Sequence, residues 1–515
     1  MIKLRLNHSL WDRIENYHTS KDEKISFLFA NAIKRGKDLI IVVSGKGTFP
    51  DTDHYISSSP THLNLYKGVM DRIMSDFAES SHNVLINIHH HPFSQKGTTF
   101  SSVDNRDDVK MDRYLREELI LLKDKEELDF DGRELFNLSI VLDQNSFDAR
   151  LTDIRKKPKF QKLDQVQCIG RKLIIKTPNS NKLQHKSDSI DSRQDFIGQD
   201  QLQWLKLAKV GVCGAGGLGS IYCEGLLRLG VRNITLIDDD RLEISNLNRF
   251  QTGQKSQVGQ AKVDVLRDNL QAMEPEVVVQ GIQASIASDE AIQALTACDI
   301  IIGGTDNHFS RAILNHLSVQ YLIPYFDAGV EVIEKPEVNF RDRLFVVTPG
   351  ESACMECTPF SILDSEQVVK SFLNTELENE FRYRGYITEQ AEVKSPSVYP
   401  LNQVAAGTLL IEFLNYIAGF KAMGSVIHND YQRGVHERSD DDNFPENHPQ
   451  EDCPVCSFYT GKGDSETLPF KKNVDPNQFF KQQIEKGESE LFTTLFTILP
   501  GSQTRVSYKR QPFKV

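Results

Sequence analysis

A glycine-rich turn in the middle of the chain has the residue types that bind a phosphate group. The β-rich run 209–213 leads into Gly214-Ala-Gly-Gly-Leu-Gly219, and the next segment has the pattern of a helix. Glycines let the backbone turn tightly and approach a phosphate, whose charge then lies at the helix N-terminus. Asp238 ends the next expected strand, where a carboxylate can accept hydrogen bonds from ribose hydroxyls. These residues alone fit a dinucleotide enzyme as well as an ATP enzyme.

Polar residues that follow the turn in the sequence help to distinguish these two classes of enzyme. They stand at Asn246, Arg249, Lys262, Asp306 and Asn307. With the glycine turn, they resemble the ThiF/MoeB/ubiquitin-activating superfamily over residues 193–430. The resemblance implies an α/β fold with a Rossmann-like, mostly parallel sheet, which adenylates a carboxylate with ATP and magnesium.

The resemblance also assigns roles to individual side chains. Arg249 and Lys262 are expected to neutralise phosphate charge as pyrophosphate leaves. Asp306 is expected to hold magnesium, a hard cation that prefers oxygen ligands. Arg193 corresponds to an arginine that reaches the ATP of a neighbouring subunit, so a homodimer through this domain is expected. The ATP-binding set is Gly214, Gly216, Gly217, Gly219, Asp238, Asp240, Asn246, Arg249, Lys262, Asp306 and Asn307.

Two Cys-x-x-Cys pairs have the spacing of a structural metal site. They are Cys354/Cys357 and Cys453/Cys456. Four thiolates at such spacings suit a closed tetrahedral zinc site, and the pairs resemble the zinc clip of the same superfamily. Members that form a thioester have a cysteine after the first pair, but residues 358–452 contain none. The sequence therefore favours adenylation without a transthiolation cysteine, as in the MoeB-like branch.

A second metal motif lies in the first third of the chain. His89, His91 and Asp104 follow an apolar strand in the order His-x-His-Pro and Ser-x-x-Asp. Residues i and i+2 of a strand point the same way, so the two imidazoles can converge on a metal, whereas a one-residue shift would use His90. Two imidazoles and one carboxylate leave a fourth zinc position for water. The alternative is a surface histidine cluster.

This motif resembles the JAB/JAMM metalloproteases, which cut isopeptide or C-terminal peptide bonds. That family uses a glutamate as general base, and Glu23 stands where relatives carry it. Ser101 is expected to donate a hydrogen bond to the developing oxyanion. The resemblance thus implies an N-terminal α/β zinc hydrolase domain.

The apolar patterns predict the elements that hold these residues. We expect a helix at 23–35 and strands at 38–43 and 83–88. The expected domains are a hydrolase at 1–165, a linker at 166–192, an adenylation domain with its zinc clip at 193–460, and a tail of unassigned role at 461–515. The polar stretch 432–452 is expected to be a mobile insertion.

The composition excludes several functional classes. The 515 residues are 39% hydrophobic and 26% charged, which is typical of a globular protein with two or three domains. A net charge of −12 argues against nucleic-acid binding. No apolar run approaches the length of a membrane span, and we expect a cytoplasmic protein.

Together the two motifs suggest one shared substrate, the C-terminus of a ubiquitin-like or sulfur-carrier protein. The hydrolase would trim a precursor or release a conjugate, and the second domain would adenylate the carboxylate. This fusion resembles bacterial ubiquitin-like modification systems, in which a conjugating enzyme is a further partner. The alternatives are a cofactor-synthesis enzyme acting on a sulfur carrier, and a modifier-binding scaffold with an inactive hydrolase.

Overall fold

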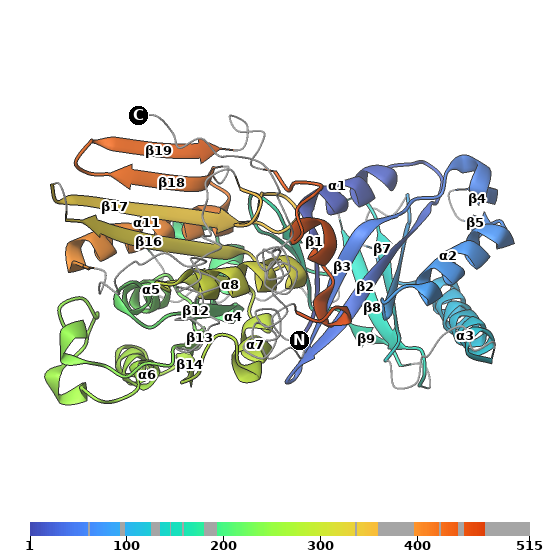
Figure 1. Cartoon of the computed structure of the whole chain (residues 1–515). Coiled ribbons are helices and arrows are strands. Elements are labelled where there is room, and N and C mark those ends of the chain that lie inside the picture. Colours follow the sequence, from blue (N-terminus) through green and yellow to red (C-terminus); the bar gives the residue numbers. More distant parts are fainter. Residues whose placement is uncertain are drawn as a thin grey trace, which may run out of the picture.

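The chain folds into two α/β halves that lie side by side (Figure 1). The computed structural model describes residues 1–59, 62–92, 98–124, 134–144, 146–156, 159–179, 193–334, 337–358, 396–421, 424–440 and 448–468. Within these residues, no helix combines the length and the apolarity needed to cross a membrane.

The first half is a nine-stranded mixed sheet with helices on both faces. Its strand order is β11-β10-β1-β3-β2-β6-β7-β8-β9. Its elements are β1 (Ile2–Asn7), α1 (His8–Tyr17), β2 (Ile25–Arg35), β3 (Asp38–Thr48), α2 (Lys67–Glu79), β6 (Val84–His90), α3 (Ser102–Asp124), β7 (Phe136–Leu142), β8 (Phe147–Asp153), β9 (Gln161–Lys162), β10 (Gln165–Ile169) and β11 (Ile174–Lys176), together with the small hairpin of β4 (Tyr55–Ser59) and β5 (His62–Leu65).

The second half is an eight-stranded sheet that changes from parallel to antiparallel pairing. The strands run in the order β14-β13-β12-β15-β16-β17-β18-β19, parallel up to β16 and antiparallel beyond it. The elements are α4 (Gln199–Leu207), β12 (Lys209–Cys213), α5 (Gly217–Arg228), β13 (Asn233–Ile237), α6 (Lys262–Met273), β14 (Val278–Ile282), α7 (Asp289–Thr296), β15 (Ile300–Gly303), α8 (His308–Tyr321), β16 (Tyr325–Ile333), β17 (Asn339–Val347), α11 (Tyr399–Ala418), β18 (Gly424–Asp430), β19 (Val435–Asp440) and α12 (Cys456–Tyr459). The expected mostly parallel sheet is therefore mixed.

Three expectations about local structure are wrong. Residues 25–35, expected within a helix, form strand β2, which is buried along most of its length. An apolar run buried on both faces of a sheet lacks the alternation that distinguishes a strand from a helix. The expected linker at 166–192 contains β10 and β11, which extend the first sheet; residues 180–192 lie outside the described part. The expected mobile insertion at 432–452 contains β19, which pairs with β18; residues 441–447 lie outside the described part.

The two halves share a continuous core. Ile33, Ile40 and Val42 of the first sheet belong to the same buried cluster as the strands of the second sheet. On β1, Leu4 and Leu6 instead belong to the separate core of the first half. The first sheet is therefore buried on both of its faces.

A buried ion cluster lies at this junction. Nζ of Lys3 is 2.6 and 2.8 Å from the two carboxylate oxygens of Asp299, which precedes β15. Nη2 of Arg5 donates to the carbonyl of Cys298 at 2.7 Å, and Gln167 donates to Asp299 at 2.8 Å. Burial would raise the pKa of Asp299, but Lys3 and Arg5 lower it to about 2. The cluster thus joins β1 and β10 to the start of β15.

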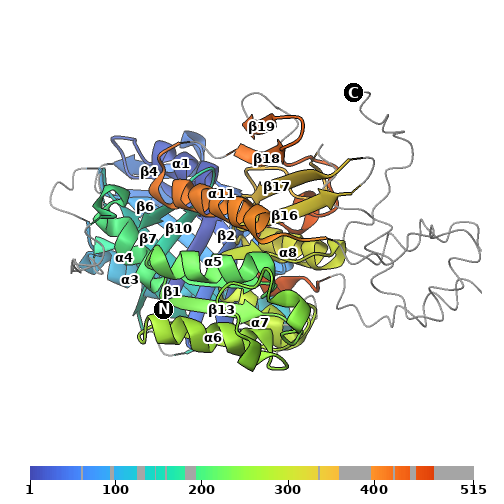
Figure 2. The same ribbon diagram turned by 90° about the vertical axis from the view of Figure 1, so that its left-hand side faces the viewer.

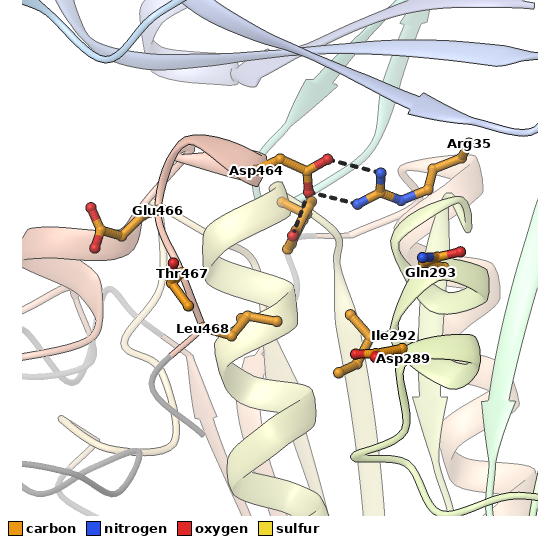
Figure 3. Close-up of a pocket in the computed structure, with 9 residues that line it drawn as sticks. Arg35, Asp289, Ile292, Gln293, Asp464, Glu466, Thr467 and Leu468 are labelled. Carbon is orange, nitrogen blue, oxygen red and sulfur yellow. Dashed lines mark hydrogen bonds and ion pairs between the residues drawn. The ribbon is translucent and has the colours of Figure 1, made fainter. Parts of the chain in front are cut away.

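The segment 461–468 lies across the same junction, after the last cysteine pair. Arg35 on β2 donates to Asp464 through Nη1 at 2.8 Å and Nη2 at 2.6 Å, and Tyr321 of α8 donates to it at 2.8 Å (Figure 3). Nε2 of Gln320 donates to the carbonyls of Gly463 and Glu466, each at 2.7 Å. The start of the expected tail therefore contacts both halves.

Candidate active sites

The glycine turn connects β12 to the N-terminus of α5, as its sequence predicts. Gly214 has φ +91, and a Cβ there would lie 2.8 Å from the carbonyl oxygen of Gly304. A Cβ on Gly219 would collide with the carbonyl of Gly214, and one on Gly217 would collide with the amide of Asn402. A Cβ on Gly216 would meet open space. Gly216 therefore marks the side of the turn that a phosphate can approach.

Asp238 and Lys262 lie beside this turn. Oδ2 of Asp238 accepts a hydrogen bond from the backbone of Ala215 at 2.6 Å, which ties the end of β13 to the glycine turn. Nζ of Lys262 donates to Oδ2 of Asp240 at 2.6 Å and lies 3.9 Å from Oδ1 of Asp238. Burial raises the pKa of Asp238, although Lys262 opposes that effect. The lysine is thus held beside the glycine turn by carboxylates.

The remaining polar residues of the predicted ATP site cap local turns. Oδ1 of Asn307 accepts from the backbone of Ser310 at 2.8 Å and caps α8, and Asp306 before it is exposed. Oδ1 of Asn246 accepts from the backbone of Glu243 at 3.0 Å, which leaves its amide nitrogen available to a ligand oxygen. Nη1 of Arg249 donates to the carbonyl of Ser245 at 2.9 Å.

Arg193 lies apart from this group within the chain. The side chain of its neighbour Gln194 donates to the carbonyl of Arg228, the last residue of α5, at 2.8 Å. The glycine turn is at the other end of this 12-residue helix, about 18 Å away. Arg193 therefore does not contact the glycine turn of its own chain.

A comparison with protein families identifies the family of this half. The model of the ThiF family matches residues 191–455. The chain belongs to the ThiF family. The predicted Rossmann-type adenylation domain is thereby confirmed, and its glycine turn and polar residues lie where parallel strands end, the usual ligand position in such sheets.

Two of the chain's curated relatives are adenylyltransferases. An adenylyltransferase and sulfurtransferase MOCS3 of Culex quinquefasciatus is 35% identical over 213 residues, which is 41% of this chain and 46% of that protein. A sulfur carrier protein adenylyltransferase of Thermus thermophilus is 31% identical over 195 residues, which is 35% of this chain and 71% of that protein. The chain spans about half the length of the first of these relatives.

A solved structure also aligns with the chain. The crystal structure of E. coli MccB with ATP is 21% identical, with a TM-score of 0.41, over 52% of this chain and 75% of that one.

In the N-terminal half, the structure brings together His89, His91 and Asp104. Nε2 of His89 lies 3.3 Å from Oδ1 of Asp104, and Nε2 of His91 lies 3.7 Å from Oδ2. The ligand atoms of all three side chains lie within 4.8 Å of one another. Among the described residues, Nε2 of His89 is buried without a hydrogen-bond partner. Two imidazoles and one carboxylate, with their ligand atoms this close together, fit the requirements of a zinc site.

Neighbouring groups orient these side chains. Nδ1 of His91 lies 3.3 Å from Oγ1 of Thr98, so its Nε2 faces Asp104. His90 points elsewhere, because its Nδ1 accepts from the backbone of Lys24 at 3.1 Å and its Nε2 lies 3.0 Å from the carbonyl of Ser20. The register on β6 therefore selects His89 and His91 rather than His90.

The charges of this site act on one another. The interaction with Asp104 raises the pKa of His91, burial opposes it, and the charges of Asp104 and Glu23 raise it further. Burial would raise the pKa of Asp104, but the two histidines hold it well below its usual range. The carboxylate is therefore charged and available to a cation.

Glu23 and Ser101 come from two segments beside the triad. Ile25 pairs with His89 between β2 and β6, which places Glu23 just beyond the end of that pairing. The backbone of Glu23 is fixed on the small hairpin, since its N–H donates to Ser59 at 3.0 Å and its carbonyl accepts from Ser58 at 2.6 Å. Oγ of Ser101 accepts from the backbone of Asp104 at 3.2 Å, so this serine caps α3.

The two cysteine pairs converge on one point. Sγ of Cys354 lies 3.8 Å from Sγ of Cys453, and Sγ of Cys357 lies 3.9 Å from those of Cys354 and Cys456. Zinc–sulfur bonds of about 2.3 Å in a tetrahedron place neighbouring sulfurs about 3.8 Å apart. The cluster fits a structural zinc ion.

The other cysteines are unsuited to nucleophilic chemistry. All four are buried, namely Cys168, Cys213, Cys223 and Cys298. Burial raises the pKa of Cys223 to about 12 and that of Cys298 to about 11. A buried thiol with a raised pKa supplies little thiolate at neutral pH.

Two features of the sites were absent from the sequence-based prediction. Asn402, near the start of α11, faces Gly217, and so α11 closes one side of the glycine turn. A pocket of about 310 Å³ lies at the junction, lined among others by Arg35, Ile292 and Asp464 (Figure 3). These contacts join residues far apart in the chain, and no local pattern signals them.

Proposed function

We propose that the ThiF domain adenylates the C-terminal carboxylate of a ubiquitin-like or sulfur-carrier protein. The observation that carries the proposal is the grouping of Asp238, Lys262 and the glycine turn at one sheet edge, with Asp306 at the end of the neighbouring β15. A phosphate can enter beside Gly216, where the backbone has no side chain in its way. This is the site of an enzyme that transfers AMP from ATP.

The charged side chains of this site have complementary roles in the transfer. Lys262 and Arg249 supply positive charge to the departing pyrophosphate, and Asn246 donates to a phosphate or ribose oxygen. The exposed carboxylate of Asp306 has the oxygen donors that magnesium requires, and so it would hold the ion that accompanies ATP. The remote position of Arg193 is the reason to assign it to the ATP site of a second subunit.

The N-terminal half is proposed to be a zinc hydrolase that acts on the same carrier. His89, His91 and Asp104 would hold zinc, which when bound polarises the scissile carbonyl and activates water. Glu23 takes the proton of the attacking water and passes it to the leaving amine. Ser101 donates its hydroxyl proton to the developing oxyanion while it caps α3.

The two reactions follow in chemical order. Hydrolysis of a tail or conjugate exposes a C-terminal carboxylate, and adenylation activates that group for attack by a thiol, sulfide or amine. The Thermus relative is a sulfur carrier protein adenylyltransferase, which favours a sulfur carrier as a second candidate for the natural substrate. The two candidates differ in the final product, a thiocarboxylate or an isopeptide.

ATP–pyrophosphate exchange with carrier proteins encoded beside this gene tests the adenylation. The Lys262→Met variant removes the ammonium group that faces the phosphates, and exchange is expected to fall by about 10²–10³-fold. Cleavage of a tail-extended carrier by the same variant is expected to stay unchanged. Full exchange by the variant, or none by the wild type with any carrier, would contradict the proposal.

A further inference from the structure

Two arginines on strand β17 have different environments although they point to the same side of the sheet. Arg341 pairs across the sheet with Glu331 and Asp430, and Arg343 pairs with Gly329 and His428. Nε of Arg341 donates to Oδ2 of Asp430 at 2.8 Å, and its Nη1 lies 3.9 Å from Glu331. Arg341 is therefore neutralised by carboxylates on both neighbouring strands.

Arg343 has no such partner among the described residues. Its Nε is buried and has no hydrogen-bond acceptor. The strand neighbours facing it are a glycine and a histidine, neither of which carries negative charge. Leaving the Nε–H of a guanidinium buried without an acceptor is unfavourable, so a bound anion that accepts from it would stabilise this position.

A second cation lies beside it. A Cβ on Gly329 would be 3.1 Å from Nη2 of Arg311 and 4.0 Å from Nη2 of Arg343, so both guanidinium groups border the space above this glycine. Nε of Arg311 lies 3.1 Å from Asp327, whose other oxygen accepts from Tyr325 at 2.9 Å. Burial lowers the pKa of Arg343, and the charge of Arg311 lowers it further. The charges of Asp327 and Glu331 oppose both effects.

This space adjoins the proposed adenylation site. Gly303, the last residue of β15, pairs with Asp327, so Gly329 lies two residues beyond the end of that strand. Nη2 of Arg311 donates to the carbonyl of Thr305, which precedes Asp306, at 2.9 Å. Helix α11 lies against the other face of β16 and β17 (Figures 1 and 2). Its Tyr416 packs on Phe326 there. The arginines are therefore on the side away from α11.

We propose that Arg343, assisted by Arg311, binds the terminal carboxylate of the protein substrate before it reacts with ATP. The inference rests on the proposed adenylation and identifies what holds its second substrate. The guanidinium of Arg343 offers a planar pair of donors that matches a carboxylate, while Arg311 adds positive charge. Gly329 leaves the space for the extended tail, because a side chain there would crowd Arg311.

The first test measures carboxylate recognition directly. A fluorescent hexapeptide ending in Gly-Gly is prepared as the free acid and as the C-terminal amide, and both are titrated into the full chain. Wild type is expected to prefer the acid by about tenfold, as for a hydrogen-bonded ion pair. Arg343→Gln is expected to abolish this preference, and Arg341→Gln, the matched control two residues away, is expected to keep it.

A second test replaces the peptide with a small carboxylate ion. Formate, added at constant ionic strength against chloride, is expected to raise the Tm of wild type and Arg341→Gln more than that of Arg343→Gln. Equal responses of all three proteins, together with no acid preference in the wild type, would overturn the site. An equal loss in both variants would also overturn it, because only general surface charge would remain.

Exchange kinetics separate this proposal from the adenylation itself. With a responsive carrier, Arg343→Gln is expected to raise the KM for the carrier about tenfold and to leave the KM for ATP unchanged. An equal rise in both constants would assign Arg343 to the nucleotide site and overturn the proposal.

If no carrier supports exchange but the acid preference depends on Arg343, the anion site stands and adenylation fails. If exchange occurs and is insensitive to Arg343, adenylation stands and the anion site fails.

Discussion

The two candidate sites balance their charges differently. At the adenylation site, Lys262 donates to Asp240 at 2.6 Å and lies 3.9 Å from Asp238, so a cation and its carboxylates already neutralise one another. At the candidate metal site, the single carboxylate of Asp104 faces two imidazoles, with Nε2 of His89 at 3.3 Å and Nε2 of His91 at 3.7 Å. Under the proposed function, Lys262 would leave its carboxylates to contact a phosphate, whereas the histidine site would hold its ion between ligands that already face one another.

The two candidate sites also differ in which parts of the chain supply their residues. The metal-binding side chains come from the end of β6 and the first turn of α3, 13 residues apart at the closest point. The adenylation site gathers the ends of β12, β13 and β15, and α11 covers it. Disturbing the junction should therefore affect the proposed adenylation site through the long-range order of its sheet.

The largest expected effect concerns the proposed hydrolase alone and should leave the adenylation site unchanged. Glu23→Gln removes the proposed general base, and cleavage of a tail-extended carrier should fall by about 10²–10⁴-fold. Bound zinc, measured by mass spectrometry, and ATP–pyrophosphate exchange should both stay at wild-type levels, because the substitution leaves the three ligands in place. Cleavage at the wild-type rate would remove Glu23 from the mechanism, and loss of zinc would make it a structural residue.

An intermediate effect tests whether the two sites share one folded unit. Lys3→Met leaves the buried Asp299 without its closest cation, which should cost about 3–5 kcal/mol of unfolding free energy. Both activities should then be lost over the same temperature range, because the junction joins both sheets. Lys34→Met is the matched control: it breaks a more exposed ion pair with Glu134 on the same sheet and should cost at most about 1 kcal/mol. Separate inactivation temperatures would show that the halves unfold independently.

The smallest effect concerns the helix that carries Asp104. Burial raises the pKa of Asp112 on α3 to about 6, so this group binds a proton more tightly in the folded protein than in the unfolded chain. Its contribution favours the folded state below about pH 4 and is lost as the pH rises through about 6. Asp112→Asn should therefore raise stability at pH 7 by about 1–3 kcal/mol and have little effect near pH 4.

Asp108 is the contrasting control on the same helix. Its Oδ2 accepts from Nε of Arg150 at 2.7 Å, so Asp108→Asn should destabilise the protein at pH 7 by removing one charge of a buried pair. Denaturant unfolding of both variants at pH 4 and pH 7 provides the measurement. A stability loss at pH 7 for Asp112→Asn would show that its carboxylate is held charged by partners.

The sequence by itself determined the parts of this protein that depend on nearby residues. The glycine turn needs glycine because the backbone is closely packed there. A side chain on Gly214 or Gly219 would collide with atoms of the same turn or of the segment after the neighbouring strand. The two Cys-x-x-Cys pairs set the ligand type of the thiolate cluster before their position was known. Such features depend on local geometry and ligand chemistry, which spacing along the chain records.

Only the tertiary structure decided what depends on pairing across the fold. It turned residues 25–35 into a strand buried on both faces, and it brought Lys3 to Asp299, 296 residues away. It also gave Arg341 a carboxylate partner and left Arg343 facing Gly329, although the two arginines are close in sequence and identical in type. The physical reason is that a charge is balanced by its neighbours in space, and the register of a sheet chooses those neighbours.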